Sequence, residues 1–389
     1  MIAVAVVFWV CVALLLYAQV GYGLLLAGMR VARSRRRPTG RRQQTSDPDP
    51  DRLPRVAIVV AAYAEGAVIA AKVRNLRALD YPPDRVRVIV ACDGSPDDTA
   101  AQARAAGADT VLELPRGGKI RAQDAAVRAA LAGGGVDLLA FSDANALWEP
   151  GALVRLVAPF ADPAVGYVCG HVSFEAPDGT NQEGVYWRYE MWLRGAESEL
   201  ASVTAGNGAI YAVRPQAYVE IDPAMSHDLT FPCLIVKRGC RAVDAPDARA
   251  HEKMTPSIED EFARKRRMAA RAWPTVLYGG MLSPRGYGPL YALMIFSHRL
   301  LRYGSPLLHV LALGTSVVLA VTGAGSVYVV AVALQLALLA ASVLGRWVPS
   351  RPLLIARYYV LTTASLAAGL WDLARGATTV AWEPAEGTR

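Results

Sequence analysis

The first 29 residues contain no charged side chain, and this run constrains the chain more than any other feature. Its apolar part, residues 2–26, is about 25 residues long, enough for a helix rising 1.5 Å per residue to cross a hydrocarbon core about 30 Å thick. No basic segment precedes the run, whereas a secretory signal peptide normally carries one. We therefore expect an uncleaved membrane anchor over residues 1–29.

A basic segment follows the apolar run, and residues 30–53 are expected to form a juxtamembrane linker. No acidic residue interrupts its arginines before Asp47: Arg30, Arg33, Arg35, Arg36, Arg37, Arg41 and Arg42. Basic residues flank membrane helices mainly on the cytoplasmic side, so we expect the middle of the chain to be cytoplasmic. Membrane topology thus accounts for most of the formal net charge of +7, and nucleic-acid binding is not inferred from it.

The C-terminal third is apolar again. Residues 306–323, 327–344 and 353–370 are candidate membrane spans, whereas residues 291–303 carry charge and could lie along the interface or form a short span. We assign residues 256–288 to amphipathic interface helices, residues 289–375 to transmembrane or interfacial helices, and residues 376–389 to a tail. The number of spans, and hence the side of the tail, stays open.

Between these ends, residues 54–255 alternate short apolar runs with helical stretches. The runs RVAIVVAAY, RVRVIVACD, TVLEL and VDLLAFSD are each followed by a turn and a helix-like segment. Strands that alternate with helices indicate an α/β fold with a mostly parallel, Rossmann-like sheet flanked by helices on both faces.

Polar side chains follow the ends of these four runs: Tyr63, Glu65, Asp93, Lys119 and Asp143. Ligands of such sheets bind outside the carboxyl ends of the strands, so these residues are expected to share one site. Each signal alone has a simpler interpretation, because DGS is an ordinary turn and RGGK lacks the P-loop pattern. Asp143 and Asn145 offer the oxygen ligands that a hard divalent cation requires.

Taken together and in this order, four segments resemble the motifs of the family-2 glycosyltransferases, which are inverting enzymes with the GT-A fold. AAYAEGAVI resembles the motif of the first strand, ACDGSPDDT the motif that contacts uracil, RGGK the motif that faces the diphosphate, and FSDAN the DxD motif. The resemblance covers about residues 54–275, and the apolar ends match the membrane-integrated, polysaccharide synthase-like branch.

The resemblance implies a role for each matching residue. Tyr63, Glu65 and Asp93 would hold the nucleoside, Lys119 would face the diphosphate, and Asp143 would bind both donor and metal. Asn145 would be a second ligand of Mg²⁺ or Mn²⁺. Two positions depart from the family pattern, since Ala64 replaces an Asn and Asn145 replaces the second Asp.

The acceptor side is expected to include Gly206 and Asn207 in TAGNGAIYAVRP, which resembles the family's acceptor loop and strand. In the following segment, MSHDLTFP, Asp228 matches the Asp of the family and His227 occupies its Glu position. We expect Asp228 to be the general base that deprotonates the acceptor hydroxyl, and His227 to tune it or bind acceptor. The simpler alternative for Asp228 is a helix N-cap.

The segment IEDEFARKRRMAARAW, residues 258–273, resembles the interface helix in which processive members carry QxxRW. Arg271 and Trp273 match it in part, because no Gln is present and Ala272 separates the pair. Arg271 could steady the departing diphosphate, and Trp273 could stack on a sugar. An amphipathic helix on the membrane surface is an equal alternative.

The sequence therefore predicts an integral membrane glycosyltransferase that uses a nucleotide-sugar, with a UDP-sugar as the first expectation. Its acceptor would be a polysaccharide, or a lipid-linked molecule in a non-processive glycolipid-forming reaction. A third alternative is a non-catalytic scaffold with a degenerate nucleotide-sugar site. Sugar, acceptor, linkage and oligomeric state are not predicted.

Overall fold

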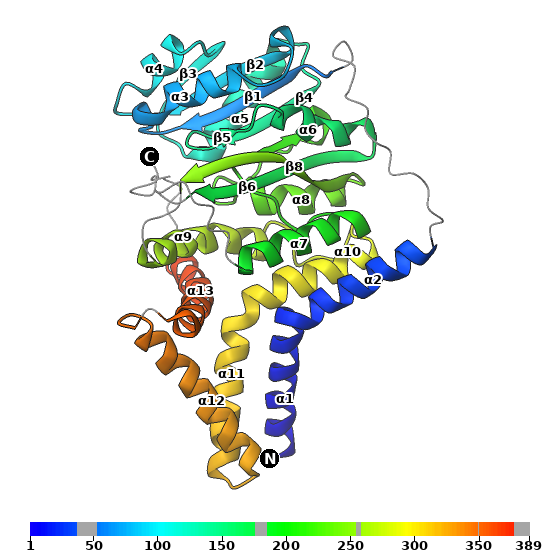
Figure 1. Cartoon of the computed structure of the whole chain (residues 1–389), viewed down its shortest axis with the longest axis vertical. Helices are drawn as coiled ribbons and strands as arrows, with labels where there is room; N and C mark the ends of the chain where they lie inside the picture. The colour runs from blue at the N-terminus through cyan, green and yellow to red at the C-terminus, as the bar shows by residue number, and fades with distance from the viewer. Residues whose placement is uncertain (37–52, 176–184, 254–257, 349, 377–389) are drawn as a thin grey trace. The chain divides into compact units, whose positions relative to one another are not determined.

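The computed structural model describes residues 1–36, 53–175, 185–253, 258–348 and 350–376 (Figure 1). Most of the predicted linker and nearly all of the predicted tail lie outside these residues. The chain divides into two compact units. Among the described residues, one comprises residues 1–27, 258–273, 292–348 and 350–376, and the other comprises residues 28–36, 53–175, 185–253 and 274–291. We call them the membrane unit and the catalytic unit.

The catalytic unit is built on one eight-stranded sheet with the order β3-β2-β1-β4-β7-β6-β8-β5. Strands β3, β2, β1 and β4 are parallel, β7 runs antiparallel to β4 and β6, and β5 runs antiparallel to β8. Its strands are β1 (Val56–Ala62), β2 (Val86–Asp93), β3 (Thr110–Leu114), β4 (Leu138–Asp143), β5 (Leu147–Trp148), β6 (Val165–Glu175), β7 (Tyr211–Val213) and β8 (Arg241–Lys253). The predicted parallel strands, β1 to β4, are confirmed. The antiparallel pairings of β5 and β7 in the other half make the sheet mixed.

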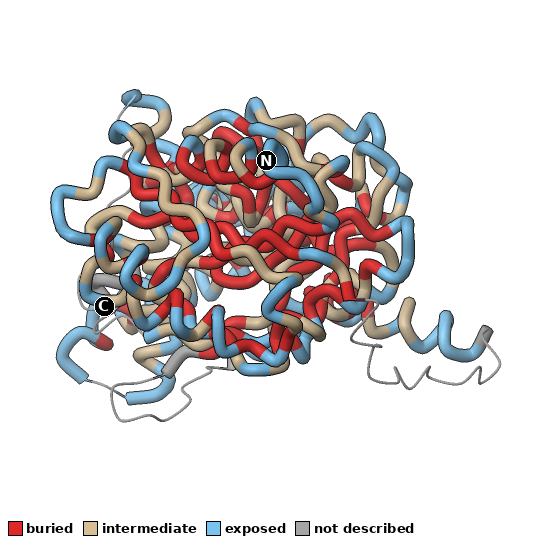
Figure 2. The backbone as a smooth tube through the Cα atoms, turned by 90° about the horizontal axis from the view of Figure 1, so that it is seen from above, coloured by how far each residue is buried: buried red, intermediate tan, exposed pale blue. Residues whose placement is uncertain are grey.

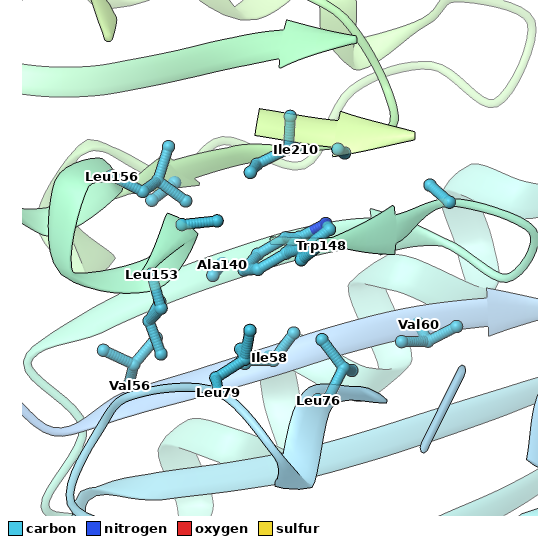
Figure 3. Close-up of a cluster of buried hydrophobic side chains, with 14 of the residues drawn as sticks. Val56, Ile58, Val60, Leu76, Leu79, Ala140, Trp148, Leu153, Leu156 and Ile210 are labelled. Carbon is cyan, nitrogen blue, oxygen red and sulfur yellow. The ribbon is translucent and has the colours of Figure 1, made fainter. Parts of the chain in front are cut away.

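Helices cover both faces of this sheet: α3 (Gly66–Arg77), α4 (Thr99–Ala105), α5 (Lys119–Ala132), α6 (Ala152–Val157), α7 (Val185–Leu200) and α8 (His227–Lys237). All seven residues of β1 are buried, because alternate side chains enter two different cores. Ile58 and Val60 pack with α3 and α6, and Trp148 lies within this cluster (Figure 3). Val59 packs on the opposite face with α5 and α8. Buried residues, among them those of β1, are drawn red in Figure 2.

The membrane unit is helical, and three of its helices continue along the chain into residues of the catalytic unit. Helix α1 (Ile2–Leu16) continues through a π-helical segment, Tyr17–Gly21, into α2 (Tyr22–Arg36). Later in the chain come α9 (Ile258–Leu277), α10 (Pro289–Met294), a π-helical segment at Ile295–Leu300, α11 (Leu301–Val321), α12 (Ser326–Leu344) and α13 (Arg351–Ala374).

Four helices of the described residues are long and apolar enough to cross a membrane: Ile2–Arg35, Pro289–Val321, Ser326–Leu344 and Arg351–Ala374. Residues 291–303, which the sequence left between two interpretations, are helical and continuous with α11 in a single candidate span. A helix can remain continuous there because π-helical hydrogen bonding accommodates an extra residue per turn without ending the helix.

The arginines that follow the anchor make specific contacts within the catalytic unit. Arg30 forms a two-point ion pair with Glu199 at 2.7 and 2.8 Å, and Arg33 donates to the carbonyl of Leu200 at 3.0 Å. Two arginines of the basic run are therefore engaged by the end of α7.

Candidate active site

The loop after β1 is fastened to the turn after β2. The backbone amides of Ala64, Glu65 and Gly66 donate to the side chains of Ser95, Thr99 and Asp97 at 3.2, 2.9 and 3.0 Å, respectively. These bonds explain why the sequence after Asp93 is rich in short polar residues, which form such turns readily. They bring the first two strand-end motifs together.

Ala64 is strained in this loop. Its φ of +49° is the only positive φ of a non-glycine residue in the described part of the chain. Asparagine adopts this left-handed region more readily than alanine does. The departure from the family pattern at position 64 therefore has a structural consequence, and the loop tolerates it because the amides of residue 64 and of the two residues after it are anchored.

Asp93 organises the Gly-rich loop that precedes α5. Its carboxylate is 1% exposed and accepts hydrogen bonds from the amides of Gly117 at 2.7 Å and Gly118 at 3.0 Å. Arg116 completes the set with an ion pair at 3.1 Å, and its guanidinium carbon lies 3.1 Å from the ring centre of Tyr63. Asp93 thus sets the position of the segment that carries Lys119.

Tyr63, Glu65 and Asp93 lie at the adjacent ends of β1 and β2, as the strand-end argument predicts. Glu65 is 4% exposed, so its side chain faces the interior. Their contact with a nucleoside stays a prediction. The sequence did not single out Arg116, although its position immediately before the GGK turn was a usable signal.

Lys119 and Asp143 form an ion pair between the start of α5 and the end of β4. Both side chains are partly exposed, at 18% and 24%. Gly208 lies directly against them, because a β-carbon added there would be 3.2 Å from Oδ2 of Asp143 and 3.3 Å from Nζ of Lys119. Gly208 was not predicted as a site residue, although it belongs to the same GNG pattern as Gly206 and Asn207.

The donor set suits a divalent cation that arrives with a diphosphate. Asp143 offers one carboxylate, and the half-buried amide of Asn145, two residues later, makes no side-chain hydrogen bond within the described residues. No group of three acidic, His or Cys side chains that could hold a metal occurs among these residues. Magnesium is typically held by one or two carboxylates together with substrate phosphates, and Asp143 with Asn145 fits that mode.

The loop of residues 204–210 crosses from the donor side to α8. The Gly206 amide donates to the carbonyl of Asp228 at 2.7 Å. Asn207 fixes the loop on β6, since its amide nitrogen donates to the Gly170 carbonyl at 2.7 Å and its oxygen accepts from the Ala209 and Ile210 amides. The Asn207 side chain is therefore engaged in holding the loop, and its contact with an acceptor stays a prediction.

Asp228 is the second residue of α8, whose N-cap is Ser226. The N-cap alternative for Asp228 is therefore not what the structure shows. Its Oδ1 accepts from the adjacent Leu229 amide at 3.0 Å, and the side chain is half-buried. Its other oxygen accepts no side-chain or backbone hydrogen bond within the described part of the chain, so the carboxylate can accept a proton.

His227, the residue before Asp228, is buried. Its Nδ1 lies 2.6 Å from the Tyr211 hydroxyl, its ring stacks on Phe231 at 4.0 Å, and it is 4% exposed. Burial, and to a smaller degree the positive charge of Lys119, lowers the pKa of the imidazole well below its usual range. His227 is therefore neutral where a Glu would introduce a second acid beside Asp228. Tyr211 was not among the predicted site residues.

Arg271 and Trp273 belong to α9 in the membrane unit. Within that unit, the Trp273 indole donates to the Leu366 carbonyl at 2.9 Å and packs edge-on against Tyr303 at 5.4 Å. Trp273 has a packing role there, and the predicted roles of both residues towards diphosphate and sugar stay predictions.

Comparison with known proteins identifies the family and the fold. A family profile described as "Glycosyltransferase like family 2" matches residues 54–271, more than half of the chain. The chain is 31% identical over 160 residues to a beta-monoglucosyldiacylglycerol synthase from Synechocystis sp., and this match spans 40% of the chain and 31% of the relative.

A similar solved structure is the mannosyltransferase PcManGT from Pyrobaculum calidifontis in complex with GDP-Man and Mn2+. It superposes with a TM-score of 0.68 at 23% sequence identity, covering 95% of this chain and 99% of that one. This likeness confirms the predicted GT-A fold. The chain therefore belongs to glycosyltransferase family 2, and it is a glycosyltransferase with a GT-A fold and candidate membrane-spanning helices.

Proposed function

We propose that this enzyme transfers a sugar, with inversion, from a nucleotide-sugar to a lipid-linked acceptor at the cytoplasmic face of a membrane. One observation carries the proposal. A single loop contacts both halves of the reaction, because Gly208 lies against the Lys119–Asp143 pair and the Gly206 amide holds the Asp228 carbonyl. The diphosphate side and the candidate base are thereby connected through two positions of one short segment.

The chemistry follows from these side chains. Asp228 would accept the proton of an acceptor hydroxyl as the hydroxyl oxygen attacks the anomeric carbon. The bond from that carbon to the diphosphate breaks, and the oxygen arrives opposite the leaving group, which inverts the configuration. Lys119 would turn from Asp143 to the departing diphosphate. A bound Mg²⁺ or Mn²⁺, held by Asp143 and Asn145, would stabilise negative charge on the diphosphate.

The donor is the least specified part of the proposal. The family's Asp motif makes a UDP-sugar the first candidate, and Asp93 occupies that position. The structural neighbour was solved with GDP-Man, so GDP-mannose belongs in any test.

A lipid-linked acceptor is favoured by the glycolipid synthase among the relatives and by the candidate spans. A polysaccharide is the second candidate, because three candidate spans follow the amphipathic α9 and could accompany an elongating chain. The arginines after the anchor support a cytoplasmic catalytic unit, and we extend this assignment to residues 54–255 with interface helices at 256–288.

The test measures release of nucleoside diphosphate by the protein in native membranes, with a panel of UDP-, GDP- and dTDP-sugars. We expect release from one donor, loss of release with EDTA, and a fall of at least about 1,000-fold in Asp228→Asn. Asp247→Asn is the matched control, because Asp247 is an exposed acid on β8. Sizing the labelled product separates glycolipid from polymer.

The proposal is wrong if no donor binds to the folded protein, and a non-catalytic scaffold would then take its place. It is also wrong if Asp228→Asn turns over at the rate of the wild type and of Asp247→Asn.

A further inference from the structure

A buried lysine lies behind the loop that carries Asp143 and Asn145. Lys72, on α3, is 0% exposed, and its ammonium donates a hydrogen bond to the carbonyl of Ala146. It lies 5.1 Å from the ring centre of Trp148. Within the described residues, no carboxylate lies close enough to form an ion pair with it. A buried ammonium without a carboxylate partner is unfavourable, because transfer from water removes its hydration.

The ammonium of Lys72 is not needed to hold the segment after β4 in place. Asn75, one turn further along α3, holds the same segment with two backbone bonds: its amide nitrogen donates to the Trp148 carbonyl at 2.9 Å, and its oxygen accepts from the Trp148 amide at 2.8 Å. The Trp148 indole also donates to the Ala209 carbonyl at 2.9 Å. An apolar side chain at position 72 would pack in this cluster without the cost of a buried charge.

The charge of Lys72 lies beside the loop that carries Asp143 and Asn145, because its ammonium contacts the Ala146 carbonyl in that loop. Burial lowers the pKa of Lys72 to about 7, and the carboxylates of Asp143 and Glu252 partly offset that effect, so the side chain is mostly charged below pH 7. Lys72 is 0% exposed and the Asp143 side chain 24% exposed, so both groups are shielded from water to a large extent. Charges interact more strongly inside a protein than across solvent.

We propose that Lys72 is a positioning residue that sets the positive potential behind the loop of residues 143–146 and so favours a diphosphate over a bare cation. The inference rests on the proposed function. It has a distinctive consequence, because one positive charge attracts a nucleoside diphosphate and repels a divalent cation at the same place. Removing the charge should change the two affinities in opposite directions, whereas loosening the loop would weaken both.

The experiment compares wild type with Lys72→Met, which keeps the length of the side chain and removes its charge. The protein is the full chain in lipid nanodiscs at about pH 6, where Lys72 is charged. The probes are Mn²⁺ alone, followed by electron paramagnetic resonance, and UDP or GDP without metal, followed by calorimetry. We expect the nucleotide to bind about tenfold more weakly and Mn²⁺ about tenfold more tightly. Arg74→Met, which removes an exposed charge from the same helix, should change neither.

Lys72→Gln guards against a folding defect, since its amide still offers a donor near the Ala146 carbonyl. It should give the same pair of opposite shifts. Weakening of both ligands, or no change in either, overturns the inference while the proposed function stands. If the folded wild type binds neither nucleotide, the proposed function fails and the inference fails with it.

Discussion

Gly208→Ala should reduce turnover without destabilising the fold. The new β-carbon would lie 3.2 Å from Oδ2 of Asp143 and 3.3 Å from Nζ of Lys119, so these groups must move by a few tenths of an ångström. Both are ends of side chains and can move, and no positive φ opposes alanine at this position. A displacement of 1 Å can cost about 100-fold in rate, so we expect a loss of about tenfold here, with stability changed by less than about 1 kcal/mol.

The assay is donor turnover at saturating substrate, together with thermal unfolding of the purified protein. Gly195→Ala is the matched control: this glycine lies inside α7, and its added β-carbon would meet only Asp244, at 3.9 Å. Removing a helical glycine should stabilise the protein by about 0.5–1 kcal/mol and leave turnover unchanged. Wild-type turnover in Gly208→Ala would refute the placement of this loop against the catalytic pair.

Other variants test the framework of the site. Ala64→Asn should raise the free energy of unfolding by about 0.5–1 kcal/mol, because asparagine adopts a φ of +49° more readily; an unchanged melting temperature would contradict this. Asp93→Asn should lower the free energy of unfolding by about 2 kcal/mol, since the single oxygen of an amide cannot accept all three hydrogen bonds from residues 116–118. Unchanged stability would refute the role of Asp93 in positioning this segment. The folded structure lowers the pKa of His227 well below its ordinary value of 6.5, so at pH values just below 6.5 the imidazole is protonated only in the unfolded chain. The free energy of unfolding of the wild type should therefore fall by up to about 1.4 kcal/mol per pH unit as the pH falls, and that of His227→Gln should fall less, as acid denaturation would measure.

The parallel half of the sheet was readable from the sequence for a physical reason. Strands buried on both faces are largely apolar, and β1, β2 and β4 each contain such a run, with α3 and α4 following β1 and β2. The same rule predicted that their carboxyl ends would share a site. Asp93 and Asp143 are accordingly the last residues of β2 and β4, and Tyr63 and Lys119 follow β1 and β3.

The other half could not be read in this way. Strand β8 contains Pro246 and exposed Asp247, and its pairing with β6 shifts register twice. It lacks a continuous apolar run, and its parallel pairing joins segments about 75 residues apart, which no local pattern encodes. Strand β5 has only two residues and exists because β8 lies beside it. Long-range pairing therefore overrides local propensity here.

The same limit applies to the site. Motif positions at strand ends were predictable, whereas Gly208 and Lys72 matter because distant elements approach the loop after β4. Lys72 looks like an ordinary surface lysine in the helix GAVIAAKVRNLR, and only its complete burial distinguishes it. Trp273 shows the opposite limit, because a motif can match in part while its indole packs within the membrane unit.

The charges of the catalytic unit indicate why an amide at position 145 is compatible with catalysis. On the diphosphate side, Lys119 neutralises Asp143, and on the acceptor side the buried His227 beside Asp228 is neutral. In the proposed reaction, an arriving diphosphate would compete with Asp143 for Lys119, and its own oxygens would replace the carboxylate as the partner of the ammonium. Asp143 would then be released to a cation that the diphosphate brings. A carboxylate at position 145 would strengthen the hold on both Lys119 and a bare cation, and would oppose that exchange.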